Sequence, residues 1–165
     1  MSKTYNILIL CTGNSARSIL GEALFNQLGA GRFRAFSAGS HPSGKVNPFA
    51  VEQLVTLGYP TTDLRSKSWD EFALADAPQM DFVITVCDNA AGEVCPLWPG
   101  HPITAHWGFP DPAAVEGTDE QKRAAFAQTL RQIRHRVQLF LSLPLETLDR
   151  MAIENKMRAI GKQAL

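Results

Sequence analysis

Short apolar runs alternate along the chain with longer segments in which apolar residues recur every three or four positions. The runs over residues 5–10 and 82–86 are almost continuously apolar, as is typical of buried strands, and we expect two further short strands over residues 34–38 and 104–107. Helical spacing predicts longer elements over Ser18–Leu28, Asn47–Leu57, Glu120–Leu141 and Leu145–Gln163, with a short helix over Lys67–Ala75.

This alternation of strands with helices predicts the fold class. We expect a three-layer α/β/α fold with a central parallel sheet of about four strands, because parallel strands need a crossover connection, usually a helix. Ligands of such sheets bind beyond the carboxyl ends of the strands. Four chemically capable residues fall at or near the predicted strand ends: Cys11, Ser37, Cys87 and His106. We therefore expect the functional site at that edge of the sheet.

Composition and charge narrow the possible functions. The 165 residues are 45% hydrophobic and 19% charged, which indicates one globular domain rather than a disordered chain. Sixteen Lys and Arg residues balance sixteen Asp and Glu residues, so no overall charge favours nucleic acid or an anionic membrane. No run approaches the roughly 18 apolar residues of a membrane-spanning helix, and residues 1–6 lack the apolar stretch expected of a signal peptide. We therefore expect a cytoplasmic protein.

The strongest motif is a Cys-x5-Arg loop between the first predicted strand and helix: Cys11-Thr12-Gly13-Asn14-Ser15-Ala16-Arg17-Ser18. Backbone N–H groups of a tight loop at a helix N-terminus can cradle a tetrahedral oxyanion, and Arg17 can bind two of its oxygens. The same field lowers the pKa of a thiol, so we expect Cys11 to be a low-pKa nucleophile that Ser18 assists by hydrogen bonding. The alternative is a buried cysteine at a strand end, with Arg17 in a surface ion pair.

A second candidate lies in the segment His106-Trp107-Gly108-Phe109-Pro110-Asp111-Pro112. Asp111 can act as a general acid that protonates a leaving oxygen, with Pro112 restricting the position of the carboxylate. The alternative is an aspartate that only stabilises a turn by local hydrogen bonds, which is a common use of this residue.

The three cysteines, Cys11, Cys87 and Cys95, are an odd number, which argues against a structural disulfide framework and for thiols kept reduced until they are used. Cys87 and Cys95 are too far apart for adjacent helical turns, so they could pair only if the segment between them loops back. They could also be two unrelated thiols. A zinc site of Cys87, Cys95, His101 and His106 has permitted ligands, but its Cys-x7-Cys spacing fits no usual structural zinc pattern.

Together these motifs resemble the low-molecular-weight protein tyrosine phosphatase fold, and within it the phosphatase-like arsenate reductases. The resemblance spans about residues 5–141 and is carried by the loop over 11–18, Ser37-Ala38-Gly39, Val46-Asn47-Pro48, Val86-Cys87, Cys95-Pro96 and the segment over 106–113. It implies a phosphatase-like arsenate reductase domain over residues 1–143. We expect residues 144–165 to be a C-terminal helical extension packed on the same domain. The extension could instead serve self-association, so a monomer and a homodimer both stay open.

The resemblance also implies that a relay of thiols reduces arsenate to arsenite. Cys11 attacks arsenate bound by the loop, and Asp111 helps a hydroxyl group to leave. Cys87 then attacks Cys11, and Cys95 moves the disulfide outward to an external reductant, either thioredoxin or glutathione with glutaredoxin. The oxyanion-binding residues implied are Thr12, Gly13, Asn14, Ser15, Ala16, Arg17 and Ser18. No bound cofactor is implied, and residual phosphatase activity is expected because the same loop binds phosphate.

Relatives that use thioredoxin often hold a potassium ion beside this loop. Asn14, Glu22 and Ser37 match ligand positions of that pattern. The segment over residues 65–68 supplies no acid there, and the ammonium of Lys67 can take the place of the cation. We therefore expect no bound metal.

Two other functions stay open on the sequence. A low-molecular-weight protein tyrosine phosphatase is the main rival enzyme, but that branch usually carries aromatic residues after its Asp-Pro pair, where this chain has Ala113 and Ala114. It also has no use for two further cysteines. A non-catalytic protein that binds arsenicals or metals through three thiols would have no use for Arg17 or Asp111.

Overall fold

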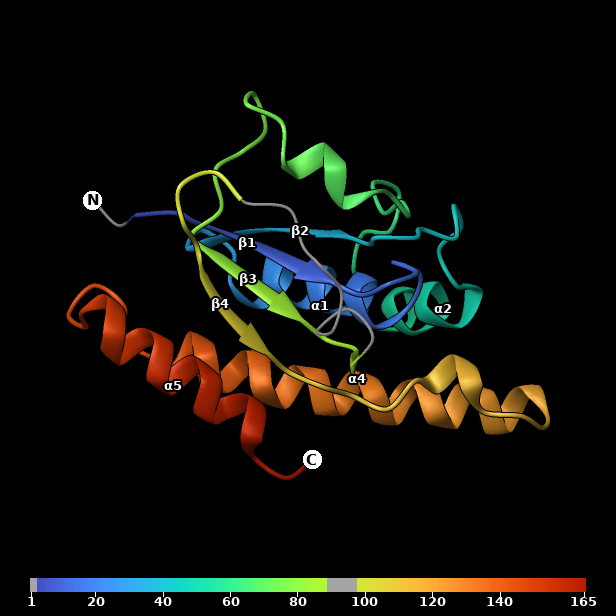
Figure 1. Cartoon of the computed structure of the whole chain (residues 1–165). Coiled ribbons are helices and arrows are strands. Elements are labelled where there is room, and N and C mark those ends of the chain that lie inside the picture. Colours follow the sequence, from blue (N-terminus) through green and yellow to red (C-terminus); the bar gives the residue numbers. More distant parts are fainter. Residues whose placement is uncertain (1–2, 89–97) are drawn as a thin grey trace.

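The structure of the protein is a computed structural model that describes residues 3–88 and 98–165. Strands and helices alternate along the chain as the sequence pattern predicts (Figure 1). The elements are β1 (Tyr5–Leu10), α1 (Arg17–Leu28), β2 (Phe33–Ala38), α2 (Pro48–Thr56), the 3-10 turn η1 (Trp69–Phe72), β3 (Phe82–Thr85), β4 (Ile103–His106), the 3-10 turn η2 (Pro112–Ala114), α4 (Asp119–Leu141) and α5 (Arg150–Lys162).

The four strands form one parallel sheet in the order β2-β1-β3-β4, which confirms the predicted fold class. Leu10 pairs with Ala38 on one side and with Thr85 on the other, and Thr85 pairs with His106. The carboxyl ends of all four strands therefore lie at one edge of the sheet. This register brings the residues that follow the strands, at positions 11, 39, 86–87 and 107, to the same edge.

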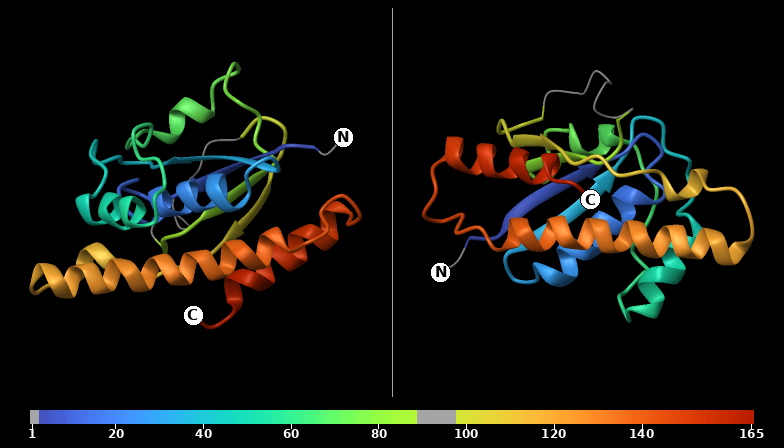
Figure 2. Two further views of the ribbon diagram at one scale, coloured as in Figure 1. Left: turned by 180° about the vertical axis from the view of Figure 1, so that it is seen from behind. Right: turned by 90° about the horizontal axis from the view of Figure 1, so that it is seen from below.

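Alternate residues of β1 point to opposite faces of the sheet and enter two separate cores. Ile7 and Ile9 belong to the larger core, which α1, α4 and α5 cover. Leu8 and Leu10 belong to a smaller core with Phe72 of η1. Figures 1 and 2 show the helices on one side of the sheet and the segment with η1 on the other. Among residues 3–88 and 98–165, the third layer contains only the short helical turn η1.

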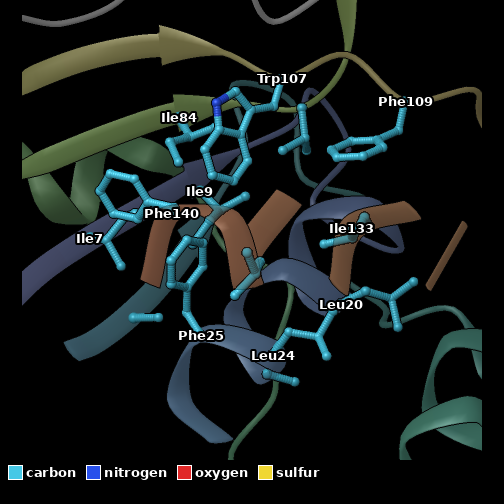
Figure 3. Packing of buried hydrophobic residues seen from close by; sticks show 14 of the residues in the cluster. Ile7, Ile9, Leu20, Leu24, Phe25, Ile84, Trp107, Phe109, Ile133 and Phe140 are labelled. Carbon is cyan, nitrogen blue, oxygen red and sulfur yellow. The ribbon is translucent and has the colours of Figure 1, made fainter. Parts of the chain in front are cut away.

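Aromatic rings occupy the centre of the larger core (Figure 3). The ring of Phe140 in α4 lies 5.2 Å from that of Phe82, 5.9 Å from that of Trp107 and 6.0 Å from that of Phe25. All four side chains are buried almost completely. The cluster joins α4 to α1 and β3, and through Trp107 it anchors the start of the segment that carries Asp111.

Side chains cap the helices close to where the sequence predicts their ends. Asn47 precedes α2, where its Oδ1 accepts from the N–H of Phe49 (2.9 Å) and Pro48 occupies the first helical position. Thr118 and Gln121 form a reciprocal capping box at the start of α4. These local signals explain why the boundaries of α2 and α4 lie within one residue of the predicted ones.

Two predicted helices are wrong in extent. The expected helix over Lys67–Ala75 is only the turn η1, which Ser68 caps. The expected helix over Leu145–Gln163 begins at Arg150, because Asp149 caps it by accepting from the N–H of Ala152 (2.8 Å). Before that cap the chain makes a turn, in which Thr147 donates its N–H and its hydroxyl to the carbonyl oxygen of Pro144.

Helix α5 turns back along α4 and lies beside β4 (Figures 1 and 2). Leu145, Ile153, Met157 and Ile160 are buried in the larger core. The indole Nε1 of Trp107 donates to the carbonyl oxygen of Met157 (2.9 Å). Residues 145–160 therefore share a core with the sheet. Across the described ranges, none of the helices combines the length and the apolar character needed to cross a membrane.

Candidate active site

The loop between β1 and α1 turns several of its carbonyl groups outward. Three of them accept backbone N–H groups of the segment after β2: Thr12 O from His41 (3.0 Å), Gly13 O from Ser43 (2.9 Å) and Ser15 O from Asn47 (2.8 Å). Because carbonyl and N–H groups of one peptide point in opposite directions, outward carbonyls direct N–H groups toward the inside of the loop.

Gly39 makes the close approach of this loop to β2 possible. A Cβ atom at that position would overlap the carbonyl oxygens of Cys11 and Thr12, both of which are backbone atoms. The N–H of Cys11 donates in turn to the carbonyl oxygen of Ala38 (3.2 Å). The sequence analysis quotes Gly39 only as part of a motif, and the structure supplies the steric reason for a residue without a side chain.

The first turn of α1 adds further donors. The helix begins at Arg17, and its N-cap residue, Ala16, has no side chain that could cap it. The first N–H groups of a helix have no partner within the helix, and its dipole places positive potential there. This end of α1 therefore offers an anion both hydrogen-bond donors and a favourable field.

A cavity of about 200 Å³ opens over the loop. Its lining residues come from the loop, from the end of β3 and from the segment after β4: Cys11, Thr12, Gly13, Ser15, Ala16, Arg17, Cys87, Asp111 and Ala113. The structure thus brings Cys11, Arg17, Cys87 and Asp111 to one small cavity, although a hundred positions separate the first from the last. No aromatic side chain is among the described lining residues.

Arg17 links the loop to the segment that carries Asp111. Its Nη1 donates to the carbonyl oxygen of Phe109 (2.8 Å), and its Nη2 lies 3.7 Å from Asp111 Oδ2. Asp111 also caps η2, because its Oδ1 accepts from the N–H of Ala113 (2.9 Å). The turn-forming use of Asp111 and its position in the cavity are therefore both present in the structure.

Cys11 and Cys87 are buried thiols, not joined in a disulfide, and they follow the neighbouring strands β1 and β3. The N–H of Thr12 donates to Cys87 Sγ (3.3 Å). The hydrogen bond with Cys87, then burial, raise the pKa of Cys11 far above that of an ordinary thiol, although the Arg17 guanidinium and the Gly13 N–H oppose this shift. The sequence-based expectation of a low pKa for Cys11 is therefore wrong for this arrangement, because it considered the loop without the second thiol. Two thiols in contact favour one negative charge and disfavour two.

Asn14 holds the loop from below. It is fully buried and has a positive φ of 45°, a conformation that Asn tolerates better than most residues. Its Nδ2 donates to Ser18 Oγ (2.8 Å) and Ser37 Oγ (3.0 Å), and its Oδ1 accepts from the N–H of Lys67 (2.9 Å). The side chains of Asn14 and Ser18 lie beneath the loop and do not line its cavity, and the bond from Asn14 leaves the Ser18 hydroxyl proton available as a donor.

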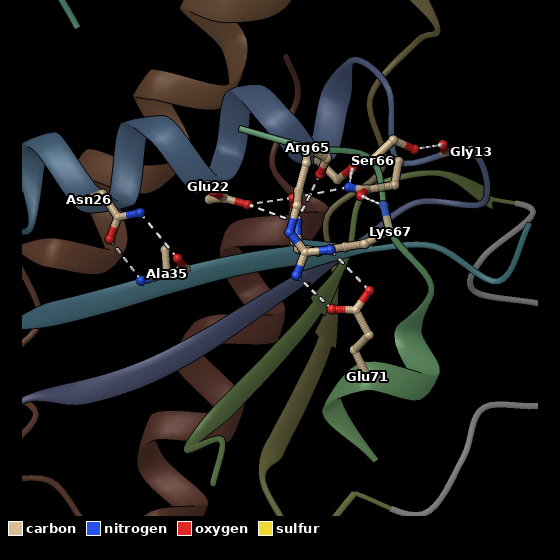
Figure 4. A network of polar contacts seen from close by, with 11 residues as sticks. Gly13, Glu22, Asn26, Ala35, Arg65, Ser66, Lys67 and Glu71 are labelled. Carbon is tan, nitrogen blue, oxygen red and sulfur yellow. Dashed lines mark hydrogen bonds and ion pairs between the residues drawn. The ribbon is translucent and has the colours of Figure 1, made fainter. Parts of the chain in front are cut away.

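A buried ion pair continues this network away from the cavity (Figure 4). Ser37 Oγ donates to Glu22 Oε1 (2.5 Å), and Lys67 Nζ lies 3.6 Å from the same oxygen and donates to the carbonyl oxygen of Arg65 (2.9 Å). Burial raises the pKa of Glu22 and lowers that of Lys67, and in each case the charge of the partner opposes the shift. The loop is therefore supported by a polar network that is itself buried.

Lys67 contacts two of the three residues that match the potassium pattern: its backbone N–H donates to Asn14, and its ammonium group places a positive charge beside Glu22. Over residues 3–88 and 98–165, no group of three or more His, Cys, Asp or Glu side chains could hold a metal ion. Cys95, which the sequence analysis names as the resolving thiol and as a zinc-ligand candidate, lies outside the described residues.

His106, the last residue of β4, lies at the edge where the sequence predicts the site, and its side chain makes two contacts there. Its Nδ1 is 2.8 Å from Thr85 Oγ1 and its Nε2 is 2.9 Å from Asp88 Oδ1. It thus bridges residues on both sides of Cys87. A single histidine at a strand end carries no sequence signal for such a contact, because Thr85 lies on another strand and Asp88 lies just beyond it.

Comparisons with known proteins agree with this geometry. Residues 6–154 match the family model of low molecular weight phosphotyrosine protein phosphatases. The chain is 39% identical to an arsenate reductase of Halalkalibacterium halodurans over 134 residues, which are 81% of this chain and 93% of that protein. Its structure is similar to an arsenate reductase in a phosphate-binding state, with a TM-score of 0.65 and 26% identity over 84% of this chain and 98% of that one. It is also similar to a thioredoxin-dependent arsenate reductase of Corynebacterium glutamicum, with a TM-score of 0.55 and 26% identity over 84% of this chain and 64% of that one.

We expect Cys87→Ala to lower the pKa of Cys11. The substitution removes the hydrogen bond and the charge of Cys87, both of which raise this pKa, and it leaves Arg17 and the Gly13 N–H, which lower it. The rate of Cys11 alkylation as a function of pH, followed by peptide mass spectrometry, gives the midpoint. Cys95→Ala is the matched control, because it leaves both cavity thiols in place. An unchanged or higher midpoint in Cys87→Ala would contradict the coupling of the two thiols.

We expect Lys67→Met to destabilise the protein by about 3–5 kcal/mol at neutral pH, because it leaves the buried Glu22 carboxylate without its cation. Without Lys67 the pKa of Glu22 lies further above its value in the unfolded chain. A carboxyl group with a raised folded-state pKa destabilises the fold at high pH, so the loss should shrink as the pH falls and Glu22 takes up a proton. Urea unfolding at pH 7 and pH 5 measures both quantities.

Two further variants control this experiment. Adding Glu22→Gln to Lys67→Met should recover most of the lost stability, because no charge is then buried alone. Arg123→Met breaks the exposed ion pair with Glu52 and should cost less than about 1 kcal/mol. Equal losses at both pH values, or a double variant as unstable as Lys67→Met, would show that the ion pair does not act through the charge of Glu22.

Proposed function

The chain belongs to the low molecular weight phosphotyrosine protein phosphatase family, and we propose that it is an arsenate reductase that works by a relay of thiols. The observation that carries this proposal is the second thiol, since Cys87 lies against Cys11 in the cavity. Hydrolysis of a phosphate ester needs one nucleophilic thiol. Transfer of two electrons to arsenic needs a second sulfur with which the first can form a disulfide. The relatives named as arsenate reductases support the same reaction.

Arsenate binds in the cavity over the loop. The N–H groups of the loop and of the first turn of α1 donate to its oxygens, and Arg17 binds two of them as a fork. Arg17 can do so through Nε and Nη2 while its Nη1 keeps the hydrogen bond to the carbonyl oxygen of Phe109. A tetrahedral dianion suits this set of donors, which contains one full positive charge and several partial ones.

In the first step the sulfur of Cys11 attacks the arsenic atom. Cys11 attacks as a thiolate, and Arg17 with the N–H of Gly13 favours this form by opposing the effects of Cys87 and of burial, which raise the pKa of Cys11. A bond forms between sulfur and arsenic, and a hydroxyl group leaves as water with a proton that Asp111 donates. Asp111 is the only carboxyl group among the described residues that line the cavity.

In the second step Cys87 attacks Cys11 as a thiolate. The new bond joins the two sulfurs, the bond between Cys11 and arsenic breaks, and its electron pair stays on arsenic, which leaves as arsenite. The two thiols are thereby oxidised by two electrons and arsenic is reduced by two. The N–H of Thr12, which donates to Cys87 Sγ, stabilises the thiolate that attacks.

An external thiol reductant completes the cycle. Cys95 attacks the disulfide of Cys11 and Cys87, and the resulting disulfide of Cys87 and Cys95 is reduced by exchange. Thioredoxin is the reductant proposed here, in line with the thioredoxin-dependent neighbour, and glutathione with glutaredoxin is the other outcome of the test. The relay belongs in the cytoplasm, where such reductants keep thiols reduced.

The same cavity supports a weaker phosphatase activity, because its donors do not distinguish phosphate from arsenate. Ala113 lines the cavity, and none of the described lining residues is aromatic, so the cavity offers a phosphotyrosine ring no stacking partner among them. This observation favours small aryl phosphates over phosphotyrosine peptides. A purely binding role would leave Arg17 and Asp111 without a use.

We expect Cys11→Ser and Cys87→Ser to differ in one activity and to agree in another. Both should abolish arsenate turnover, since each removes one sulfur of the first disulfide, but only Cys11→Ser should abolish hydrolysis of p-nitrophenyl phosphate. Steady-state assays of both reactions check this. Arsenate turnover in Cys87→Ser would refute the relay, and absence of turnover in the parent with any thiol reductant would indicate a binding protein.

The reductant is tested in the same assay. Thioredoxin with its reductase is expected to sustain turnover, and glutathione with glutaredoxin is not. Peptide mapping after a single turnover without reductant should find Cys87 joined to Cys95. Cys11 joined to glutathione, or full turnover in Cys95→Ser, would favour the glutathione-coupled cycle instead.

We expect Asp111→Asn to slow the reactions that have a poor leaving group by about 10²–10⁴-fold, which is the usual contribution of a general acid. Aryl phosphates with strongly activated leaving groups should react almost normally, because they need no proton. Sulfate should protect Cys11 from alkylation about as well as in the parent. Rates that fall equally for all leaving groups would indicate that Asp111 only stabilises the turn η2 and is not a general acid.

A further inference from the structure

Arg136 is a buried cation that the reaction does not use. It lies on α4 with only 4% of its surface exposed. Its Nη1 donates to the carbonyl oxygen of Gly108 (3.0 Å) and its Nη2 to that of Gln163 (2.8 Å). Its guanidinium carbon lies 4.7 Å from the ring centroid of Phe109. Within the described residues it takes part in no ion pair with a carboxylate.

A buried guanidinium without a counter-charge is costly, and burial lowers the pKa of Arg136. Two carbonyl dipoles and an aromatic face offset this cost only while all three stay in place. The planar fork of an arginine can bridge two carbonyl oxygens that face it from different segments, which an ammonium group does less well. Arg136 therefore holds residues 108–109 and the C-terminal end of α5 in one fixed arrangement.

Helix α5 packs against the other end of the same segment, at residues 106 and 107. The indole of Trp107 donates to the carbonyl oxygen of Met157 (2.9 Å). Gly161 packs so closely that a Cβ atom there would overlap the carbonyl oxygen of His106 and approach the indole ring of Trp107. Residues 106–109 are thus held between the end of β4, α4 and α5.

This segment leads directly to the cavity. Phe109 donates its N–H to the carbonyl oxygen of Val86 (3.2 Å), beside Cys87, and its own carbonyl oxygen accepts from Arg17 Nη1 (2.8 Å). Asp111 follows two residues later. The same short stretch therefore sets the resting position of Arg17 and the place from which Asp111 enters the cavity.

We propose that Arg136 and helix α5 together form a positioning device for the active site: they hold residues 106–109 so that Arg17 and Asp111 face the bound oxyanion. The inference rests on the proposed function for the role of Asp111, but its effect on Arg17 does not depend on arsenate reduction. Arg136 touches no substrate, so it acts only through Phe109 and the residues beyond it.

Arg136→Lys tests this device, because lysine keeps the charge and most of the stem but loses the fork. Hydrolysis of aryl phosphates with poor leaving groups should fall about 10-fold or more, since a misplacement of about 1 Å can cost about 10²-fold. Aryl phosphates with activated leaving groups bypass Asp111, so they should lose only the several-fold that weaker oxyanion binding by Arg17 costs. In the Asp111→Asn background, Arg136→Lys should cost the poor leaving groups no more than this smaller factor.

Sulfate protection of Cys11 from alkylation gives a readout that is independent of turnover. It should weaken several-fold in Arg136→Lys, because Arg17 loses its fixed resting position. This readout separates the two hypotheses: a parent protein that fails to reduce arsenate would refute the proposed function, whereas unchanged sulfate protection would refute the positioning of Arg17.

Arg131→Lys is the matched control, because Arg131 lies on the exposed side of the same helix, and all readouts should stay at the parent level. Gly161→Ala is the second variant, since it pushes on His106 from α5; it should produce the same dependence on the leaving group even if Arg136→Lys fails to fold. Equal losses for all leaving groups together with a lower melting temperature, or additive losses with Asp111→Asn, would show a merely structural role and overturn the proposal.

Discussion

The loop of residues 11–18 can offer N–H groups to an anion only because other parts of the chain hold its carbonyl groups on the outside. That constraint explains the surroundings of the site. The segment after β2 supplies the N–H groups of His41, Ser43 and Asn47, and Gly39 lets the loop lie against β2. Asn14 accepts an unfavourable positive φ because its side chain ties the loop to Ser37 and Lys67. The cradle is therefore a property of the loop together with its supports.

The sequence predicts the parts of this protein that depend on local pattern. The strands, the parallel sheet, the loop between β1 and α1, and the meeting of Cys11 with Cys87 all follow from apolar runs and from the rule that parallel strands end at one edge. The start of α5 is mispredicted because leucines at positions 145 and 148 continue the apolar spacing, while the cap at Asp149 overrides it. The apolar pattern indicates which residues can be buried, but it does not indicate at which residue a capping side chain starts the helix.

The electrostatic expectation for Cys11 failed for a different reason. Positive potential from Arg17 and the helix end is readable from the sequence, and both effects are present in the structure. The opposing effects come from burial and from Cys87, which follows the strand paired with β1 and lies far from Cys11 in the chain. His106 and Arg136 were missed in the same way, because their partners are backbone or side-chain atoms of distant segments. The partners of a charge or a hydrogen-bonding group are set by the tertiary structure, whereas the strand pattern is set mainly by residues that are neighbours in the sequence.

A raised pKa for Cys11 fits a relay better than a single activated thiol would. Two thiols in contact that share one negative charge keep a nucleophile ready without burying two anions. In the proposed relay, the bond between Cys11 and arsenic removes the negative charge that the Cys11 sulfur could carry. A thiolate at Cys87 then meets no like charge beside it, so the first step favours the second. In that relay the order of the two steps follows from the contact between the two sulfurs.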